Sequence, residues 1–189
     1  MRKLVVLMVL AAVLPLAGCA TPKGGTAAEK RAYIDNVEKD VLAMAYEKRP
    51  ALKAEIERAA GYGVFANINI MLLFVGGGGG YGVVVDNETR QRTYMKMGEG
   101  ELGIGLGAKD FRVVFVFNDT ETMKKFVYSG WHFGAEADAA LKADDQGGAV
   151  TAAGDVHAGI RVYQFTSTGA IASANIQGTK YWRDGKLNE

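Results

Sequence analysis

The sequence predicts an α+β fold in which a strongly curved antiparallel β-sheet or a small β-barrel packs with an N-terminal helical hairpin and one inserted helix. Three observations lead to this fold class. Apolar residues recur at three- and four-residue spacing early in the chain, short apolar runs follow from residue 61, and 25 of the 189 residues are glycine. The first pattern is typical of amphipathic helices and the second of strands. Because glycine weakens the interior of a strand, its frequency favours sharp coiling, bulges or a close approach of another group to the backbone.

The N-terminal helical hairpin is predicted between residues 29 and 59. Its first helix carries an apolar stripe formed by Tyr33, Ile34, Val37, Val41, Met44 and Ala45. Pro50 suits the first turn of a second, short helix, which Gly61 can end. Seven basic and seven acidic residues balance between residues 29 and 58, whereas helices that lie on a membrane surface usually carry a basic polar face. We therefore favour packing of the first helix on the core over a position on a membrane.

The first strands are predicted as a hairpin. Residues 81–85 and 90–97 flank a turn at Asp86-Asn87. Alternation in the second strand predicts one face open to solvent, which carries Arg90, Arg92, Tyr94 and Lys96. Residues 111–117 are apolar on both faces, so this strand has to be central and covered.

The inserted helix and the last strands follow. Residues 118–128 are predicted to be helical, with Asn118 as N-cap and Gly130 beyond the end. Residues 159–166 and 170–183 are predicted to form a further hairpin, joined by Ser167-Thr168-Gly169. Between these elements, glycines at positions 103, 105 and 107 fall on one face of a predicted strand. Without side chains at these positions the sheet would have a shallow trough, which a helix or an acyl chain could fill.

The N-terminus has the pattern of a lipoprotein signal peptide. Residues 1–3 supply a positive region, residues 4–14 an apolar stretch too short to span a bilayer, and Leu16-Ala17-Gly18-Cys19 resembles a lipobox. In such peptides the cysteine receives a diacylglycerol, and palmitate as a further acyl group, and becomes the mature N-terminus. The alternative is an ordinary secretory signal with an incidental cysteine, but Cys19 is the chain's one cysteine and no other competes for a structural role.

This resemblance also predicts an address and a domain division. Ala20 stands where an aspartate would retain a lipoprotein in the inner membrane, so the resemblance implies the outer membrane of a Gram-negative bacterium, with the globular part in the periplasm. We expect residues 1–18 to be the signal peptide, 19–28 a flexible tether, and 29–189 a single domain.

The charge balance argues against nucleic acid as a partner. Of the 22 basic residues, Arg2 and Lys3 leave with the leader, so 20 basic and 21 acidic side chains remain and the formal charge is about −1. Nucleic-acid-binding domains usually show a basic excess or a clustered basic face. Any attraction to anionic lipid must therefore come from the arrangement of charges in space.

The sequence offers little to support catalysis, a cofactor or a metal. Two glycine patterns, at residues 77–82 and 98–103, fit a dinucleotide fingerprint, but strand residues follow them instead of a helix. His132 and His157 lack metal-ligand spacing, and no Gly-x-Ser-x-Gly occurs. A hydrolase remains an alternative, with paired carboxylates drawn from Glu99, Glu101, Glu136 and Asp138. We expect a protein that is not an enzyme and that needs no cofactor.

A series of blocks in the chain resembles the SYLF lipid-binding domain family. They run in order from residue 59 to residue 182: Ala60-Gly61-Tyr62-Gly63-Val64-Phe65; residues 76–84; residues 103–117, leading into a helix with Phe126; Gly134-Ala135-Glu136-Ala137; and Val162-Tyr163, followed by Gly169-Ala170 and Gly178. The family occurs in bacterial lipoproteins and secreted proteins and in eukaryotic trafficking and actin-associated proteins. The sequence departs from it at Tyr62, often basic in eukaryotic members, and at Ala66, commonly proline.

The resemblance implies lipid binding, with phosphoinositides as eukaryotic ligands and actin as a eukaryotic partner. The departure at Tyr62 weakens transfer of phosphoinositide specificity, and a periplasmic address makes actin an improbable partner. We expect membrane lipid as the partner, with lipid contacts drawn from Lys109, Arg112, Lys124, Lys125, Lys180, Trp131 and Trp182. The alternative for each lysine is a side chain that is only solvated, and for both tryptophans a position in the core. The alternative is a scaffold lipoprotein of the cell envelope that acts through protein partners, whose identity the sequence leaves unknown.

Overall fold

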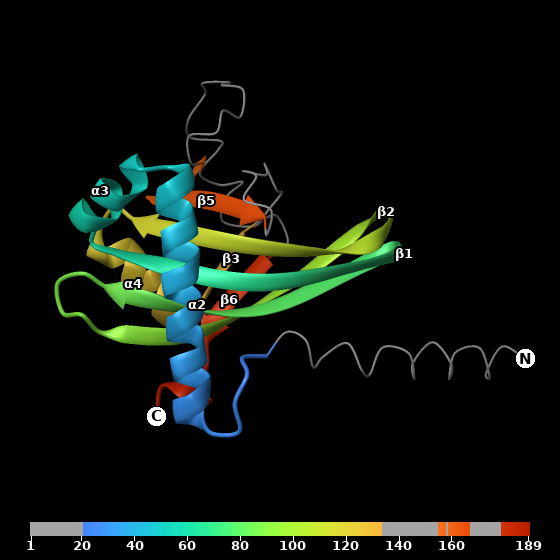
Figure 1. Ribbon diagram of the computed structural model, residues 1–189, viewed down its shortest axis with the longest axis horizontal. Helices are drawn as coiled ribbons and strands as arrows, with labels where there is room; N and C mark the ends of the chain where they lie inside the picture. Colours follow the sequence, from blue (N-terminus) through green and yellow to red (C-terminus); the bar gives the residue numbers. More distant parts are fainter. Residues whose placement is uncertain (1–20, 134–154, 158, 167–178) are drawn as a thin grey trace, which may run out of the picture.

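The computed structural model describes the backbone of residues 21–133, 155–157, 159–166 and 179–189, and the side chains of residues 21–68, 77–100, 112–132, 159–165 and 179–189 (Figure 1). The predicted signal peptide, Cys19, the predicted turn at residues 167–169 and the predicted trough at Gly103, Gly105 and Gly107 therefore lie outside the described residues or side chains.

Two consecutive helices open the described fold. Helix α2 spans Ala27–Lys48 and α3 spans Ala51–Arg58. The Thr26 side chain accepts from the Glu29 backbone, and the Glu29 carboxylate accepts from the backbone N–H groups of Gly25 and Thr26, which forms a capping box. This box starts the helix two residues before residue 29. The predicted helical hairpin is confirmed.

A single antiparallel sheet follows, with six strands in the described part of the chain. Strands β1 (Gly61–Asp86) and β2 (Arg92–Phe117) pair along their whole length. Along the other edge of β2, β5 (Ile160–Thr166) pairs with residues 111–117 and β6 (Thr179–Arg183) with residues 95–99. Outside them lie β4 (Asp155–His157) on β5 and β3 (Trp131–Phe133) on β6.

The sheet confirms two of the strand predictions and corrects a third. The hairpin about Asp86-Asn87 is present, and residues 113–117 form a buried central strand. The predicted C-terminal hairpin is wrong in its described part, because β5 and β6 each pair with β2. Since β1 occupies one edge of β2, both later strands share the other edge.

The inserted helix α4 spans Thr120–Tyr128, and a short 3₁₀ helix, η2 (Gly185–Leu187), follows β6. Asp119, and not Asn118, caps α4, because its side chain accepts from the backbone of Thr122 at 2.7 Å. The backbone N–H of Asn118 instead donates to Gly159, which ties the end of β2 to the start of β5.

The sheet is strongly curved because β1 turns back on itself. Figure 1 shows β1 and β2 running together to a tip beyond the helices and returning, with a register shift between Leu73 and Val75. The returning part of β1 lies against its own beginning so closely that a Cβ on Gly82 would be 2.3 Å from the Val64 carbonyl oxygen. The close backbone approach expected from the glycine content is confirmed here.

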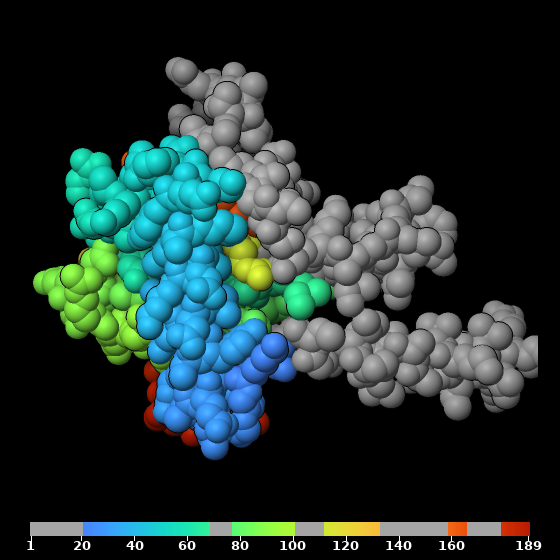
Figure 2. All heavy atoms as spheres, in the orientation of Figure 1, coloured from blue at the N-terminus to red at the C-terminus, as the bar shows by residue number. Residues whose placement is uncertain are grey.

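The two faces of the sheet carry separate cores. On one face, α4 covers an aromatic cluster that includes Phe65, Phe115, Phe126 and Tyr181. On the other, α2 and α3 cover apolar residues of β1, β2 and β5, and both helices lie across the front of the molecule in Figure 2. Packing of the first helix on the core is therefore confirmed.

The predicted solvent face of β2 is wrong, because α2 covers it. Tyr94 is buried and its hydroxyl donates to Asp35 at 3.0 Å. Arg92 forms ion pairs with Asp35, at 2.8 Å, and with the buried Glu38. This face is polar because carboxylates of α2 complement it.

Candidate functional site

Three of the predicted lipid-contact lysines and one of the tryptophans flank the sheet edge formed by β3 and β6. Lys124 and Lys125 are exposed on α4, and Lys180 and Trp182 are exposed on β6. Strand β6 alternates, so Lys180 and Trp182 point away from the buried Tyr181. Helix α4 packs on the Tyr181 side, with the rings of Phe126 and Tyr181 5.4 Å apart. The lysines thus lie on both sides of this edge.

Aromatic rings accompany these cations. Tyr128 of α4 is 60% exposed, and the Arg183 guanidinium lies 5.8 Å from the centre of its ring. Trp182 is 38% exposed, and a Cβ on Gly98 would lie 3.1 Å from its ring, so the indole rests on a glycine of β2. We call the set Lys124, Lys125, Tyr128, Lys180, Trp182 and Arg183 the β6 edge surface.

The other three predicted residues are not part of this surface. Trp131 is 3% exposed and belongs to the aromatic core, where the Lys125 ammonium lies 5.3 Å from its ring centre. Arg112 is half-buried and lies in register between Ala66 and Phe165. Lys109 pairs with Asn69 in β2, and its side chain is outside the described set. The sequence left an interface and the core open for both tryptophans, and the structure buries Trp131 and exposes Trp182.

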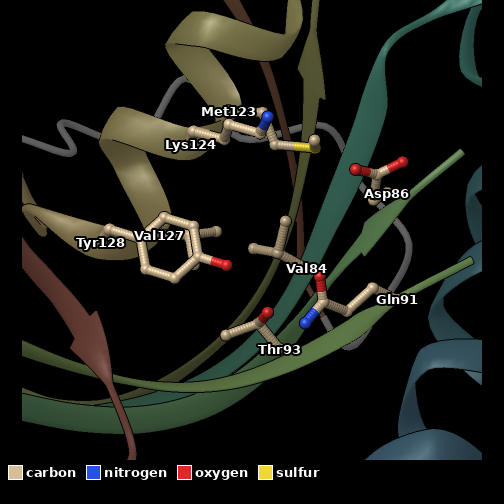
Figure 3. A pocket seen from close by; sticks show the side chains of 8 residues that line it. All are labelled: Val84, Asp86, Gln91, Thr93, Met123, Lys124, Val127 and Tyr128. Carbon is tan, nitrogen blue, oxygen red and sulfur yellow. The ribbon is translucent and has the colours of Figure 1, made fainter. Parts of the chain in front are cut away.

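A small pocket lies beside Lys124. Figure 3 shows side chains of α4 and of the β1–β2 turn around it, among them Asp86, Gln91, Lys124 and Tyr128. Its volume is about 30 Å³, which is room for a water molecule or two. The pocket is therefore too small for a lipid headgroup, and the exposed surface is the better candidate for lipid contact.

A larger hollow lies where α3 meets β5 and the end of β2. Its volume is about 330 Å³, and it is lined by Glu55, Arg58, Ala59, Val116, Asn118 and Arg161. Sequence reasoning missed these residues, because Arg58 and Arg161 are far apart in the chain and neither belongs to a motif. An excess of arginine around a hollow becomes visible only in the folded chain.

The carboxylates considered for acid–base chemistry lie only partly within the described residues. Among the residues that the structure describes, no three His, Cys, Asp or Glu side chains lie close enough together to hold a metal ion. The Glu99 carboxylate accepts from the Asn67 side-chain amide at 2.8 Å, while Glu136 and Asp138 lie outside the described residues and the side chain of Glu101 outside the described side chains. Among the described helices, none is long and apolar enough to cross a membrane.

Comparison with known proteins identifies a relative in Aeromonas veronii. The chain is 32% identical over 164 residues to a protein of Aeromonas veronii named beta cell expansion factor A. The chain is a distant homologue of that protein. The alignment covers 87% of this chain but 61% of the relative, so the chain spans about three fifths of the relative's length. No family model matches the chain.

Proposed function

We propose that this protein is a non-enzymatic, lipid-interacting domain of the SYLF type, held at the outer membrane through an acylated Cys19, and that its β6 edge surface contacts anionic phospholipid. The observation that carries the proposal is the gathering of lysines and exposed rings on both sides of one sheet edge. Lysines near a membrane surface are attracted to anionic headgroups, and tryptophan and tyrosine favour the interface.

The position of Cys19 in the sequence supports an orientation in which the N-terminal end of α2 lies toward the membrane. Cys19 precedes Thr21 by two residues, so the chain between them spans at most about 7 Å. From there the chain stays close to the domain, since the Lys23 ammonium lies 5.8 Å from the ring centre of Tyr33 on α2. An acylated Cys19 would therefore hold the N-terminal end of α2 near the membrane.

Strand β6, which carries Lys180, Trp182 and Arg183, ends near this same end of α2. Strand β6 leads directly into η2, and the Arg31 side chain of α2 donates to the Leu187 carbonyl of η2 at 3.2 Å. Figure 2 shows the C-terminal residues beside the first described residues. The anchor and the cations of β6 therefore support the same membrane orientation.

The lipid contact is tested with the chain that begins at Ala20 and vesicles containing phosphatidylglycerol. We expect salt-sensitive co-sedimentation, because exposed charges are screened by salt. The double variant Lys124→Glu and Lys180→Glu should bind at least about tenfold more weakly at low salt, since each lysine near an anionic surface contributes about 1 kcal/mol.

The matched control reverses two exposed lysines where α2 meets α3, Lys48→Glu at the end of α2 and Lys53→Glu on α3. It should bind as the unchanged chain does. Absence of binding at low salt, or an equal loss in both double variants, would show that the edge surface is not a lipid contact.

The anchor is tested separately in the full chain. We expect labelled palmitate to be incorporated and the protein to fractionate with the outer membrane. Cys19→Ala should abolish both, because it removes the one thiol that can be acylated. Unchanged labelling in this variant would rule out Cys19 as the acylated residue.

A further inference from the structure

We propose that the hollow between α3, β2 and β5 is an anion site that binds a phosphate group, carried either by a lipid headgroup or by a soluble phosphorylated molecule. Its volume of about 330 Å³ is at the lower end of the range found for small-molecule sites. Its floor includes Ala59 and the buried Val116, and charged or polar side chains surround it.

The charges at the hollow favour an anion. Among the described residues, Glu55 is the one carboxylate that lines it, and this carboxylate is already shared by several donors. It accepts from the Tyr163 hydroxyl and forms ion pairs with Arg161 at 3.4 Å and Arg49 at 3.6 Å. The described lining of the hollow thus carries two guanidinium groups, those of Arg58 and Arg161, and one carboxylate, which leaves an excess of one positive charge.

The Tyr163 hydroxyl remains a donor to Glu55 over the whole physiological range. Burial, together with the hydrogen bond to Glu55, raises the pKa of Tyr163 to about 12. The phenol therefore keeps its proton, and Glu55 stays engaged at the wall of the hollow. Because these donors compensate its negative charge, Glu55 repels an incoming anion less than an unpaired carboxylate would.

The two arginines that line the hollow have donors to spare. The Arg58 Nε donates to the Ala54 carbonyl at 3.0 Å, which fixes the guanidinium plane, and its terminal nitrogens bond to none of the described residues. Arg161 uses one terminal nitrogen on Glu55, and its side chain is 42% exposed. Guanidinium groups bind phosphate with paired, charge-assisted hydrogen bonds, and the exposed Asn118 amide can add a neutral donor.

The C-terminal end of α3 does not oppose this assignment. Carbonyl groups at a helix C-terminus carry partial negative charge and disfavour anions. Here the Ala54 carbonyl accepts from Arg58, and the Ile56 and Ala59 carbonyls accept from the Asn87 amide at 2.6 and 3.0 Å. These acceptors are therefore occupied.

The hollow adjoins the start of α4, since Asn118 lines it and α4 begins two residues later, but it lies at the far end of α2 from the first described residues (Figure 1). Helix α2 has 22 residues, so it is about 33 Å long, and α3 follows at the end opposite to the first described residues (Figure 1). A phosphate group would thus reach the hollow from solution or from a second lipid surface. The assignment does not depend on lipid contact at the β6 edge.

The test uses the acylated protein in neutral detergent micelles, titrated calorimetrically with glycerol 3-phosphate or inorganic phosphate, and then with micelles that contain phosphatidic acid. We expect binding that Arg58→Gln weakens about tenfold, because each charge-assisted bond to phosphate contributes strongly. Arg58→Gln together with Arg161→Gln should abolish it. The control Lys48→Gln with Lys53→Gln removes two charges at exposed sites nearby and should leave the affinity unchanged.

Binding of the soluble phosphates that Arg58→Gln weakens would identify a soluble ligand. Binding only to phosphatidic acid, with the same dependence on Arg58, would identify a headgroup. No binding of either kind, or binding indifferent to Arg58, overturns the proposal. Arg58 is exposed, so Arg58→Gln should keep the fold, and a thermal melt by circular dichroism checks this. Because Lys124→Glu with Lys180→Glu should retain phosphate binding, the two proposals can fail independently.

Discussion

Gly82→Ala is expected to lower the free energy of unfolding by about 3 kcal/mol, at the upper end of the usual cost of overpacking. A Cβ at this position would lie 2.3 Å from the Val64 carbonyl oxygen and 2.4 Å from Cδ1 of Phe65. Neither atom can move away easily. The Phe65 ring is fully buried and packs at 5.5 Å from Phe115 and 4.9 Å from Tyr181. Urea denaturation followed by circular dichroism measures the loss.

Gly100→Ala is the matched control, because Gly100 lies in the paired strand β2 and a Cβ there would have no atom within 4 Å. Neither glycine has a positive φ, so the two substitutions differ in space and not in backbone strain. We expect Gly100→Ala to leave stability unchanged or to raise it by about 0.5 kcal/mol, through a smaller entropy of the unfolded chain. Equal losses in the two variants would show that close approach of the β1 backbone is not the cause.

Gly82 also shows what the sequence can and cannot predict about the fold. Glycine within a strand pattern predicts that something comes close to the backbone, and this is correct. It does not predict the partner, because Val64 and Gly82 belong to the same strand and come together only where β1 turns back. Local periodicity predicts strands and helices well here, whereas the path of a long strand depends on contacts between distant residues.

The predictions for the polar face of β2 and for the C-terminal strands are wrong for related reasons. Alternation predicts correctly that Arg92 and Tyr94 share a face, but hydrophobicity cannot show that Asp35 of α2 complements it. The residues near 167 have the composition of a hairpin turn, yet β5 and β6 take places along β2. In both cases a partner distant in sequence decides the outcome.

For the candidate site, too, some features could be predicted from the sequence and others could not. Exposed lysines on α4 and β6 could be predicted from their positions in the helix and strand patterns, because charged side chains on such elements face solvent. The sequence could not show that Trp131 is buried, or that Arg58 and Arg161 line the same hollow. Both depend on how α3, α4 and β5 are placed on the sheet.

Glu38→Ala is expected to cost about 3 kcal/mol of stability, because it leaves two polar groups without their partner under α2. Glu38 is 4% exposed, accepts from the Tyr62 hydroxyl at 2.7 Å and forms an ion pair with Arg92. Asp35 cannot replace it fully, since it already pairs with Arg92 at 2.8 Å and is 31% exposed. Thermal and urea denaturation of the purified variants measure the difference.

Glu47→Ala is the control, since it removes an exposed glutamate from the same helix and should cost no more than about 0.5 kcal/mol. The Tyr62→Phe variant tests how much of the stabilisation by Glu38 comes from its hydrogen bond with Tyr62 and how much from its ion pair with Arg92. If Glu38 acts through Tyr62, its loss should cost less in the Tyr62→Phe background than in the unchanged chain. Equal costs for Glu38→Ala and Glu47→Ala would mean that apolar contacts alone hold α2, through Ile34, Val41 and Ala45. A large difference would mean that the polar face of β2 fixes where α2 lies on the sheet.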